Sequence, residues 1–312
     1  MNQKIGPLFL VALSGKTLSS EEKEAISTLG LRHFIFFARN LESREQIKEL
    51  MGELEEVAGP GLRAIDQEGG PVCRLRPPLF PKLKAPLELA REKNPEEAVA
   101  LAAKLCGRKL RALGFNFNLA PVLDLAAEEA PAFLRGRTFG SEAQKVANLG
   151  EIYIKNLQEE GVFACAKHFP GLGGVKEDPH HRLPQKEKIS PEDLLPFKAA
   201  IRAGVFAIMT THLLISTPSP QVVTFSPEII ALLRQDLSFK GLILTDDLYM
   251  GGARSDCSLE EAVLQAFLAG HDLILLCGDF WQSVSVIKNF ARECRYSPVL
   301  NQKTSKKLYF IK

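Results

Sequence analysis

The amino-acid sequence predicts a single (β/α)8 TIM-type barrel over residues 1–312. Strand-like apolar runs alternate with helix-like stretches about eight times, in a length typical of this fold. The runs are almost continuously apolar, as expected of parallel strands buried on both faces. Polar groups follow the last apolar residue of several runs, namely Asp66, Asp124, Lys167, His168, His212 and Asp246. In a barrel such strand ends converge on one face, and capping of single helices does not account for the whole set.

In the first half of the chain the expected strands are short apolar or aromatic runs, over 7–13, 33–37, 62–65 and 115–122. The expected helices are 19–29, 42–57, 95–113 and 142–157. The first of them begins with Ser-Ser-Glu-Glu, which suits a helix N-cap. The second repeats apolar residues at helical spacing, at Ile47, Leu50, Leu54 and Val57. Pro121 and Asp124 end the fourth strand; taken alone, Asp124 is best explained as a cap or turn residue.

In the second half the expected strands are 162–167, 205–210, 241–245 and 272–276. The expected helices are 191–203, with proline in its first turn, 227–237, 259–269 and the rest of the chain after residue 276. A doubly wound open sheet is the alternative fold. It is weakened because no GxGxxG or P-loop motif occurs at any strand–helix turn. No low-complexity linker divides the chain.

The composition is that of an ordinary globular protein. Net charge is +2, which gives no indication of a nucleic-acid or membrane partner. The apolar run near the N-terminus is interrupted by Gly6 and Pro7, so we interpret it as a strand and not as a signal peptide. Six cysteines without a CxxC pair fit a reducing compartment, and we expect a cytoplasmic protein.

The stretch KHFPGLGGVKEDPHHRLP, residues 167–184, is the most unusual part of the sequence. Its glycines and prolines cannot continue a helix or strand, so a long loop is expected. Three of the six histidines of the chain lie in it, His168, His180 and His181, together with Lys167 and Asp178. A glycine-rich loop that concentrates ionisable groups is typical of an active site, although a solvated surface loop has a similar composition.

The chemistry suggested by these groups is displacement with acid–base assistance. There is no GxSxG elbow and no HExxH helix. The spacing of the loop histidines matches no common metal site, so no metal or other cofactor is expected. Glycoside hydrolysis, which needs a nucleophile or base and a general acid across the sugar, fits this set.

The chain resembles glycoside hydrolase family 3, and specifically its single-domain bacterial β-N-acetylglucosaminidases. The segments that carry the resemblance run nearly end to end: IFFARN (35–40), AIDQEGG (64–70), NLAPVLD (118–124), GRTFG (136–140), KHFPG (167–171), DPHHRLP (178–184), TFSPEII (224–230) and LTDDLYMGG (244–252). The resemblance implies a barrel fold and hydrolysis of a carbohydrate, with no metal.

Residue roles follow from the same resemblance. It implies that Asp246 is the nucleophile, that His180 is the general acid/base, and that Asp178 is its partner. Strand alternation separates Asp246 from Asp247, because Leu242, Leu244 and Asp246 share one side. The resemblance implies that the sugar hydroxyls are held by Asp66, Arg74, Arg137, Lys167 and His168.

Three positions depart from the family pattern. Pro71 stands where the family has Arg, Leu172 where it has His, and Pro179 where it has Ser. The expected activity is a retaining exo-β-N-acetylglucosaminidase that removes terminal N-acetylglucosamine from muropeptide fragments in peptidoglycan recycling. The alternatives are a β-glucosidase, a glycoside phosphorylase, or a degenerate sugar-binding barrel. Neither a nucleic acid nor a membrane is an expected partner.

Overall fold

The computed structural model describes residues 4–126, 129–254 and 257–311. Its main sheet has eight parallel strands in the order β12-β9-β7-β6-β3-β2-β1-β13. Their bounds are β1 (Phe9–Ala12), β2 (His33–Phe36), β3 (Arg63–Ile65), β6 (Phe117–Asn118), β7 (Phe163–Phe169), β9 (Ala207–Thr210), β12 (Leu242–Leu244) and β13 (Ile274–Leu276). A parallel bridge between Leu244 and Leu273 joins the two edges of the sheet. The predicted (β/α)8 barrel is therefore confirmed.

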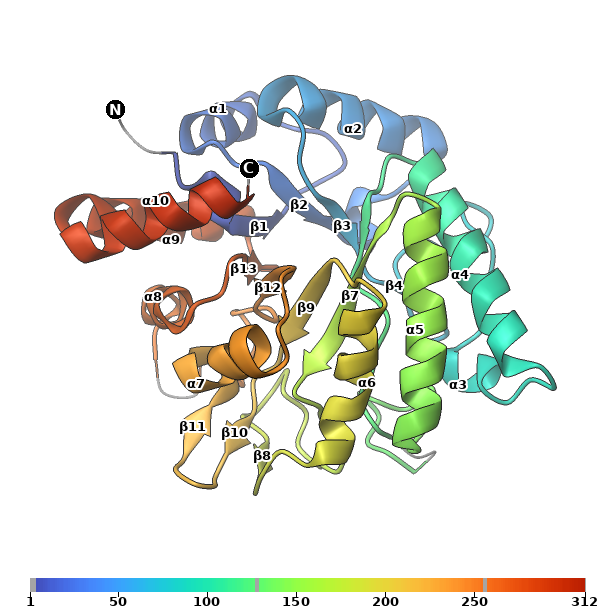
Figure 1. Cartoon of the computed structure of the whole chain (residues 1–312). Helices are drawn as coiled ribbons and strands as arrows, with labels where there is room; N and C mark the ends of the chain where they lie inside the picture. The colour runs from blue at the N-terminus through green and yellow to red at the C-terminus, as the bar shows by residue number, and fades with distance from the viewer. Residues whose placement is uncertain (1–3, 127–128, 255–256, 312) are drawn as a thin grey trace.

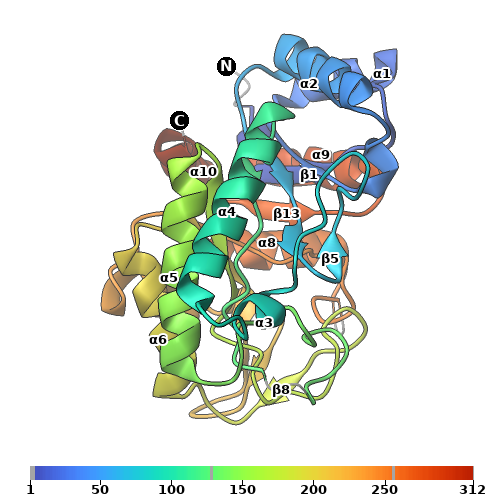
Figure 2. The ribbon, with the colours of Figure 1, turned by 90° about the vertical axis from the view of Figure 1, so that its right-hand side faces the viewer.

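Helices surround this barrel (Figure 1). Their bounds are α1 (Ser20–Leu29), α2 (Arg44–Ala58), α3 (Pro86–Leu89), α4 (Pro95–Ala112), α5 (Ala143–Glu159), α6 (Pro191–Arg202), α7 (Pro227–Ala231), α8 (Leu259–Ala269), α9 (Phe280–Tyr296) and α10 (Pro298–Ile311). Helices α4, α5 and α6 lie side by side on one flank, as Figures 1 and 2 both show. Within the described part of the chain, no helix is both long and apolar enough to cross a membrane.

Local sequence signals explain where several helices begin. Ser19 accepts a hydrogen bond from the backbone N–H of Glu22, and the Glu22 side chain accepts one from the backbone N–H of Ser19. Ser258 and Glu261 form the same reciprocal pair before α8. Each such cap is worth about 1 kcal/mol, because it satisfies N–H groups that have no partner inside the helix. The cap predicted from Ser-Ser-Glu-Glu is confirmed.

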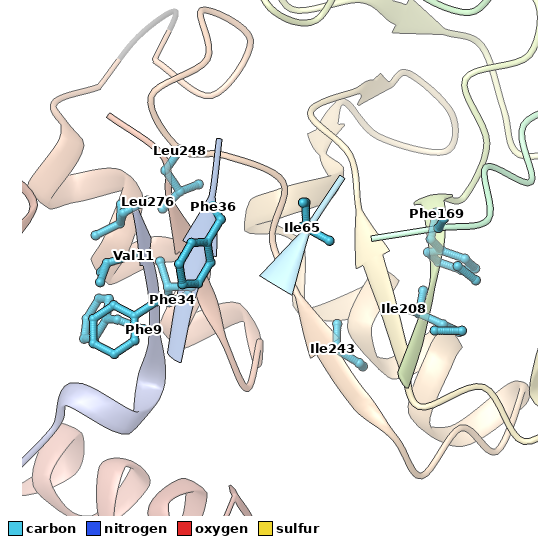
Figure 3. Packing of buried hydrophobic residues seen from close by; sticks show 14 of the residues in the cluster. Phe9, Val11, Phe34, Phe36, Ile65, Phe169, Ile208, Ile243, Leu248 and Leu276 are labelled. Carbon is cyan, nitrogen blue, oxygen red and sulfur yellow. The ribbon is translucent and has the colours of Figure 1, made fainter. Parts of the chain in front are cut away.

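The core has two layers, which follow from strand alternation. Leu10 and Ala12 of β1 belong to a cluster inside the barrel, whereas Phe9 and Val11 face the helices. Figure 3 shows part of the outer layer, where Phe34 and Phe36 of β2 lie near these two residues. The buried residues of the inner cluster are Leu10, Ala12, Ile35, Leu62, Ala64, Phe117, Leu119, Cys165, Ala207, Met209, Leu242, Leu244, Leu273 and Leu275.

This alternation also sets the direction of the site residues. Ala64, Cys165 and Leu244 are inner residues, and the side chains two positions further along their strands belong to Asp66, Lys167 and Asp246. Those three polar groups therefore continue the inner faces of β3, β7 and β12 beyond the end of the apolar core.

Three elements differ from the sequence-based expectation. Strand β7 extends through Phe169, so the long loop begins at Pro170. Strand β6 has only two residues, although the chain beyond it still bonds to β7, since the Ala120 and Pro121 carbonyl oxygens accept the N–H groups of Cys165 and Lys167. The helix expected over 227–237 is α-helical only to Ala231 and continues as a wider π-helix over Leu232–Asp236.

Two small sheets lie at the loop end of the barrel. The hairpin of β4 (Gln67–Gly69) and β5 (Val72–Cys73) follows β3 directly. The second sheet joins β8 (Gln185–Lys186), β10 (Leu214–Ile215) and β11 (Gln221–Val222), and it lies at the bottom of Figure 1. Strand β8 follows the long loop and pairs with β10, so this sheet fixes the far end of the loop.

Candidate active site

A largely buried network of five charged side chains lies at the ends of β3 and β7. The Lys167 ammonium is 2.9 Å from Asp66 Oδ1 and 2.7 Å from Glu68 Oε1. Arg74 Nη2 donates to Asp66 Oδ2 at 2.9 Å. Arg137 binds both carboxylate oxygens of Glu68, at 2.8 and 2.9 Å. Four residues expected to hold sugar hydroxyls, Asp66, Arg74, Arg137 and Lys167, are thus brought together.

Mutual attraction keeps this network ionised. Burial alone would raise the pKa of Asp66, but Lys167 and Arg74 outweigh it and hold that pKa below its usual range. Burial likewise opposes ionisation of Glu68, yet Arg137 and Lys167 lower its pKa to about 2. Burial would lower the pKa of Lys167, and the two carboxylates raise it instead. At neutral pH the site offers fixed charged donors and acceptors, which suits a ligand with many hydroxyl groups.

His168 is held by a carboxylate from the neighbouring strand end. Its Nδ1 lies 2.7 Å from Asp124 Oδ2, and both side chains are buried. Asp124 Oδ1 also accepts the backbone N–H of Leu172 at 2.8 Å. An ionised carboxylate can only accept, so Nδ1 of His168 carries the proton and Nε2 is the nitrogen left for a ligand. The expected cap or turn role for Asp124 is wrong: it starts no helix and instead orients His168 and the beginning of the loop.

The long loop carries Asp178 and His180 as a hydrogen-bonded pair. His180 Nδ1 lies 2.6 Å from Asp178 Oδ1, and the His180 backbone N–H donates to the same oxygen at 2.9 Å. Partial burial would raise the pKa of Asp178, but the contacts from His180 lower it overall. The His180 side chain remains 55% exposed, so it is accessible to a ligand. His181 is exposed, and its side chain forms no such pair with a carboxylate of residues 4–126, 129–254 or 257–311.

This loop is latched to the turn that follows β12. The Gly251 N–H donates to the His180 carbonyl at 3.0 Å, and the Gly252 N–H donates to the Pro179 carbonyl at 3.0 Å. Both glycines are required for this close approach. A Cβ on Gly251 would lie 2.4 Å from the His181 carbonyl oxygen, and one on Gly252 would lie 2.8 Å from the Pro179 carbonyl oxygen.

The same turn carries the two adjacent aspartates. The backbone N–H of Asp247 donates to Asp246 Oδ1 at 2.8 Å. Asp247 Oδ1 accepts the backbone N–H groups of Cys277 at 2.9 Å and Tyr249 at 3.1 Å. The contacts of the two carboxylates therefore differ: Asp247 ties the turn to the end of β13, and Asp246 accepts its neighbour's amide N–H.

The sequence of the whole chain matches known proteins. The family model "Glycosyl hydrolase family 3 N terminal domain" matches residues 1–304. The chain belongs to glycoside hydrolase family 3. Among its relatives, a "Beta-hexosaminidase" of Nitrosomonas eutropha is 34% identical over 286 residues, which is 88% of this chain and 81% of that protein.

Solved structures of family 3 proteins have the same fold. The β-N-acetylhexosaminidase of Beutenbergia cavernae superposes with a TM-score of 0.90 at 26% identity, covering 99% of this chain and 96% of that one. The family 3 β-N-acetylglucosaminidase of Paenibacillus sp. str. FPU-7 gives a TM-score of 0.88 at 32% identity. It covers 100% of this chain, which spans 62% of the Paenibacillus chain. Membership of the family makes this protein a glycoside hydrolase.

Sequence reasoning missed one charged member of this site, Glu68. It lies in the DQEGG segment that was singled out for Asp66, but its partners Lys167 and Arg137 are distant in sequence. Its side chain is 1% exposed, which is rare for a glutamate and marks it as part of the network.

The three departures from the family pattern are accommodated by the structure. Pro71 is exposed in the turn between β4 and β5. Leu172 is buried and uses only its backbone N–H toward Asp124. Pro179 contributes only its carbonyl oxygen to the latch with Gly252, so its missing N–H costs no hydrogen bond there. The segment between Asp124 and Arg137 is also rich in Ala and Glu, and its residues 127 and 128 lie outside the described residues.

Proposed function

We propose that the protein is a retaining exo-β-N-acetylglucosaminidase. The observation that carries this proposal is the latch between the Asp178–His180 pair and the turn that bears Asp246. It attaches an exposed imidazole with a carboxylate partner to the segment that holds a strand-end carboxylate, as a double displacement at a sugar requires. The name of the Paenibacillus relative, a β-N-acetylglucosaminidase, supports N-acetylglucosamine as the sugar, and the name of the Nitrosomonas relative, a beta-hexosaminidase, is compatible with it.

In the proposed first step, the Asp246 carboxylate attacks the anomeric carbon while His180 gives its proton to the departing glycosidic oxygen. The product is a glycosyl ester on Asp246 and a free aglycone. In the second step, His180 takes a proton from water as the water oxygen attacks the anomeric carbon, and the ester bond to Asp246 breaks. Asp178 holds the imidazole through Nδ1, which leaves Nε2 for both proton transfers.

The sugar would be bound by the charged network and His168. Asp66 can accept from hydroxyl groups, whereas Arg74, Arg137 and Lys167 can donate to them, and the buried Glu68 holds Arg137 and Lys167 in place. Charge-assisted hydrogen bonds of this kind contribute about 1.5–3 kcal/mol each. Because the network is already assembled by its internal ion pairs, little reorganisation is needed on binding.

The natural substrate is proposed to be a muropeptide fragment with a terminal N-acetylglucosamine, processed in the cytoplasm during peptidoglycan recycling. The described cysteines are all free thiols, which is compatible with that compartment.

The decisive assay compares an aryl β-N-acetylglucosaminide with the matching aryl β-glucoside, each with and without inorganic phosphate. We expect hydrolysis of the first substrate without any need for phosphate. Faster turnover of the glucoside would indicate a β-glucosidase, and sugar phosphate as product would indicate a phosphorylase. No turnover of either substrate, despite measurable sugar binding, would indicate a binding protein.

The assignment of Asp246 is tested separately. Asp246→Ala should lower kcat by several orders of magnitude, because the covalent intermediate can no longer form. Asp236→Ala, at an exposed aspartate of the π-helix, is the control and should leave kcat unchanged. Near-normal kcat of Asp246→Ala on an activated aryl glycoside would show that another group is the nucleophile.

A further inference from the structure

His212 is a fully buried histidine that the proposed mechanism does not use. It follows β9, and its relative exposure is 0%. Both ring nitrogens are engaged: Nε2 lies 2.9 Å from the Asp247 carbonyl oxygen, and Nδ1 lies 2.7 Å from Thr224 Oγ1. A carbonyl oxygen can only accept, so Nε2 carries a proton and donates to Asp247.

This hydrogen bond acts on Asp247, the residue that follows the proposed nucleophile. The Asp247 carbonyl bound by His212 belongs to the residue whose own N–H donates to Asp246 Oδ1 at 2.8 Å. Fixing both ends of Asp247 fixes the direction of that N–H. The side chain of Asp247, tied to Cys277 and Tyr249, restrains the same residue from a third side.

His212 also lies against the turn that holds the loop. A Cβ placed on Gly252 would be 3.0 Å from His212 Cβ, so the imidazole stem packs directly on the glycine whose N–H binds the Pro179 carbonyl. The same side chain thus supports the Asp246 turn and the latch of the Asp178–His180 loop.

The second ring nitrogen has a partner that adapts to either charge state of the ring. Thr224 Oγ1 lies 3.0 Å from the Thr211 carbonyl oxygen as well as near Nδ1 of His212. The hydroxyl can donate to Nδ1 of a neutral ring, or accept from it while donating to Thr211. In both arrangements Nε2 keeps its bond to Asp247. Burial lowers the pKa of His212, Asp246 opposes that shift, and His168 and His180 add to it.

We propose that His212 is a positioning residue for the double displacement: it aims the Asp247 amide at the Asp246 carboxylate and supports the glycine turn under the acid/base loop. This inference rests on the proposed function, in which Asp246 is the nucleophile. His212 itself touches neither the sugar nor the reacting atoms in this scheme.

The test uses three variants of the full chain. His212→Asn shortens the side chain and removes the donor to the Asp247 carbonyl. His212→Gln retains a donor at about the distance of Nε2. His271→Asn is the matched control, because His271 is also fully buried with two hydrogen bonds, to Thr210 Oγ1 at 2.8 Å and to the Ala266 carbonyl at 3.0 Å.

For His212→Asn we expect kcat on an aryl N-acetylglucosaminide to fall about 10- to 100-fold, the scale of a misplaced reacting group. Inhibition by free N-acetylglucosamine should change less than about threefold, since the sugar-holding network is untouched. The acid limb of the profile of kcat/KM against pH should move to higher pH, because a misdirected Asp247 amide stabilises the charged form of Asp246 less. His212→Gln should recover most of kcat, and His271→Asn should lower Tm without moving the pH profile.

Equal losses of kcat in His212→Asn and His271→Asn, or no recovery in His212→Gln, would overturn the inference. If His212→Asn does not fold, Thr224→Val provides the test, since it removes only the Nδ1 partner; we expect a loss of kcat of about 3- to 10-fold with the same shift of the acid limb. An unmoved limb in that variant would also overturn the inference. Full activity of Asp246→Ala would contradict the proposed function itself, whatever the His212 variants do.

Discussion

The backbone amide of Gly251 donates to the carbonyl oxygen of His180 at 3.0 Å, and this contact joins the two loops that carry the proposed catalytic groups. Gly252 repeats it with Pro179. Neither contact involves a side chain. The position of the imidazole relative to the Asp246 turn is therefore set by main-chain hydrogen bonds.

The first prediction is that Gly251→Ala displaces the acid/base loop. The added Cβ would lie 2.4 Å from the His181 carbonyl oxygen, so the loop has to move. Turnover of a disaccharide, whose leaving group needs a proton, should fall more than about tenfold. Turnover of a nitrophenyl glycoside should fall less. Gly15→Ala, where nothing lies within 4 Å of the added Cβ, is the control and should keep both activities. Equal losses on the two substrates would mean that the latch does not act through the general acid.

The second prediction separates a general acid from a binding residue at His180. His180→Ala should cost far more on a disaccharide than on a nitrophenyl glycoside, since a good leaving group departs without protonation. Because the second step also loses its base, glycosyl-enzyme should accumulate on Asp246. Added azide should restore turnover and give a β-glycosyl azide. His181→Ala, at the exposed neighbour, should behave like the wild type. Failure of azide to rescue, with equal losses on both substrates, would place His180 in binding or loop structure.

The third prediction concerns Glu68, which pairs with two buried cations. Glu68→Gln should lower the free energy of unfolding by about 3–5 kcal/mol at pH 7, because it leaves a buried charge without its partner. It should also weaken sugar binding. Glu151→Gln, in a surface i,i+4 pair with Lys155, should change stability by less than about 1 kcal/mol.

The pH dependence gives a sharper check on Glu68. Its pKa in the folded protein is about 2, below the ordinary value of 4.5. The carboxylate therefore stabilises the fold fully above pH 4.5, and this stabilisation is lost as the pH falls toward 2. Denaturant unfolding at pH 7, 5 and 3 measures the difference in free energy of unfolding between wild type and Glu68→Gln. This difference should become smaller only at pH 3. A difference in free energy of unfolding that stays constant from pH 7 to pH 3 would contradict the ion-pair explanation.

The fourth prediction concerns Asp247, whose pKa is shifted in the opposite direction to that of Glu68. Burial raises its pKa to about 6, although hydrogen bonds from the backbone N–H groups of Cys277 and Tyr249 oppose the shift and Asp246 adds to it. Folding therefore favours the protonated form, and wild-type stability falls as the pH rises from about 4 to 7. Asp247→Asn keeps the acceptor oxygen without the charge. Its stability relative to wild type should improve across this window by on the order of 3 kcal/mol, since each pKa unit corresponds to about 1.4 kcal/mol.

Thermal unfolding of wild type and Asp247→Asn at pH 4.5 and 7.5 measures how their difference in stability changes with pH. Asp236→Asn, at an exposed position, should follow the wild type at both pH values. Parallel Tm values of wild type and Asp247→Asn would mean that Asp247 is ionised at no cost in the folded protein.

Most of the fold could be predicted from the sequence because it rests on short-range signals. Short, continuous apolar runs indicated the positions of the eight strands, and the Ser19 cap indicated the start of α1. The site was predicted only in part. Asp66 and Lys167 could be placed because each ends a buried apolar run, but Glu68 could not, since its role depends on Arg137, 69 residues away. Pairing between Asp124 and His168 spans 44 residues, and no local pattern indicates it.

The latch of the acid/base loop has a consequence for how this loop can change over time. Its anchoring atoms are the carbonyl oxygens of residues 179 and 180, which nearly every amino acid supplies in the same place. Mutations of the side chain at 179 or 181 therefore leave the anchor intact, whereas any side chain at 251 or 252 collides with it. Side chains can therefore change on the loop side of the contact but not on the glycine side. The loop sequence can vary while the two glycines hold its backbone in the same place.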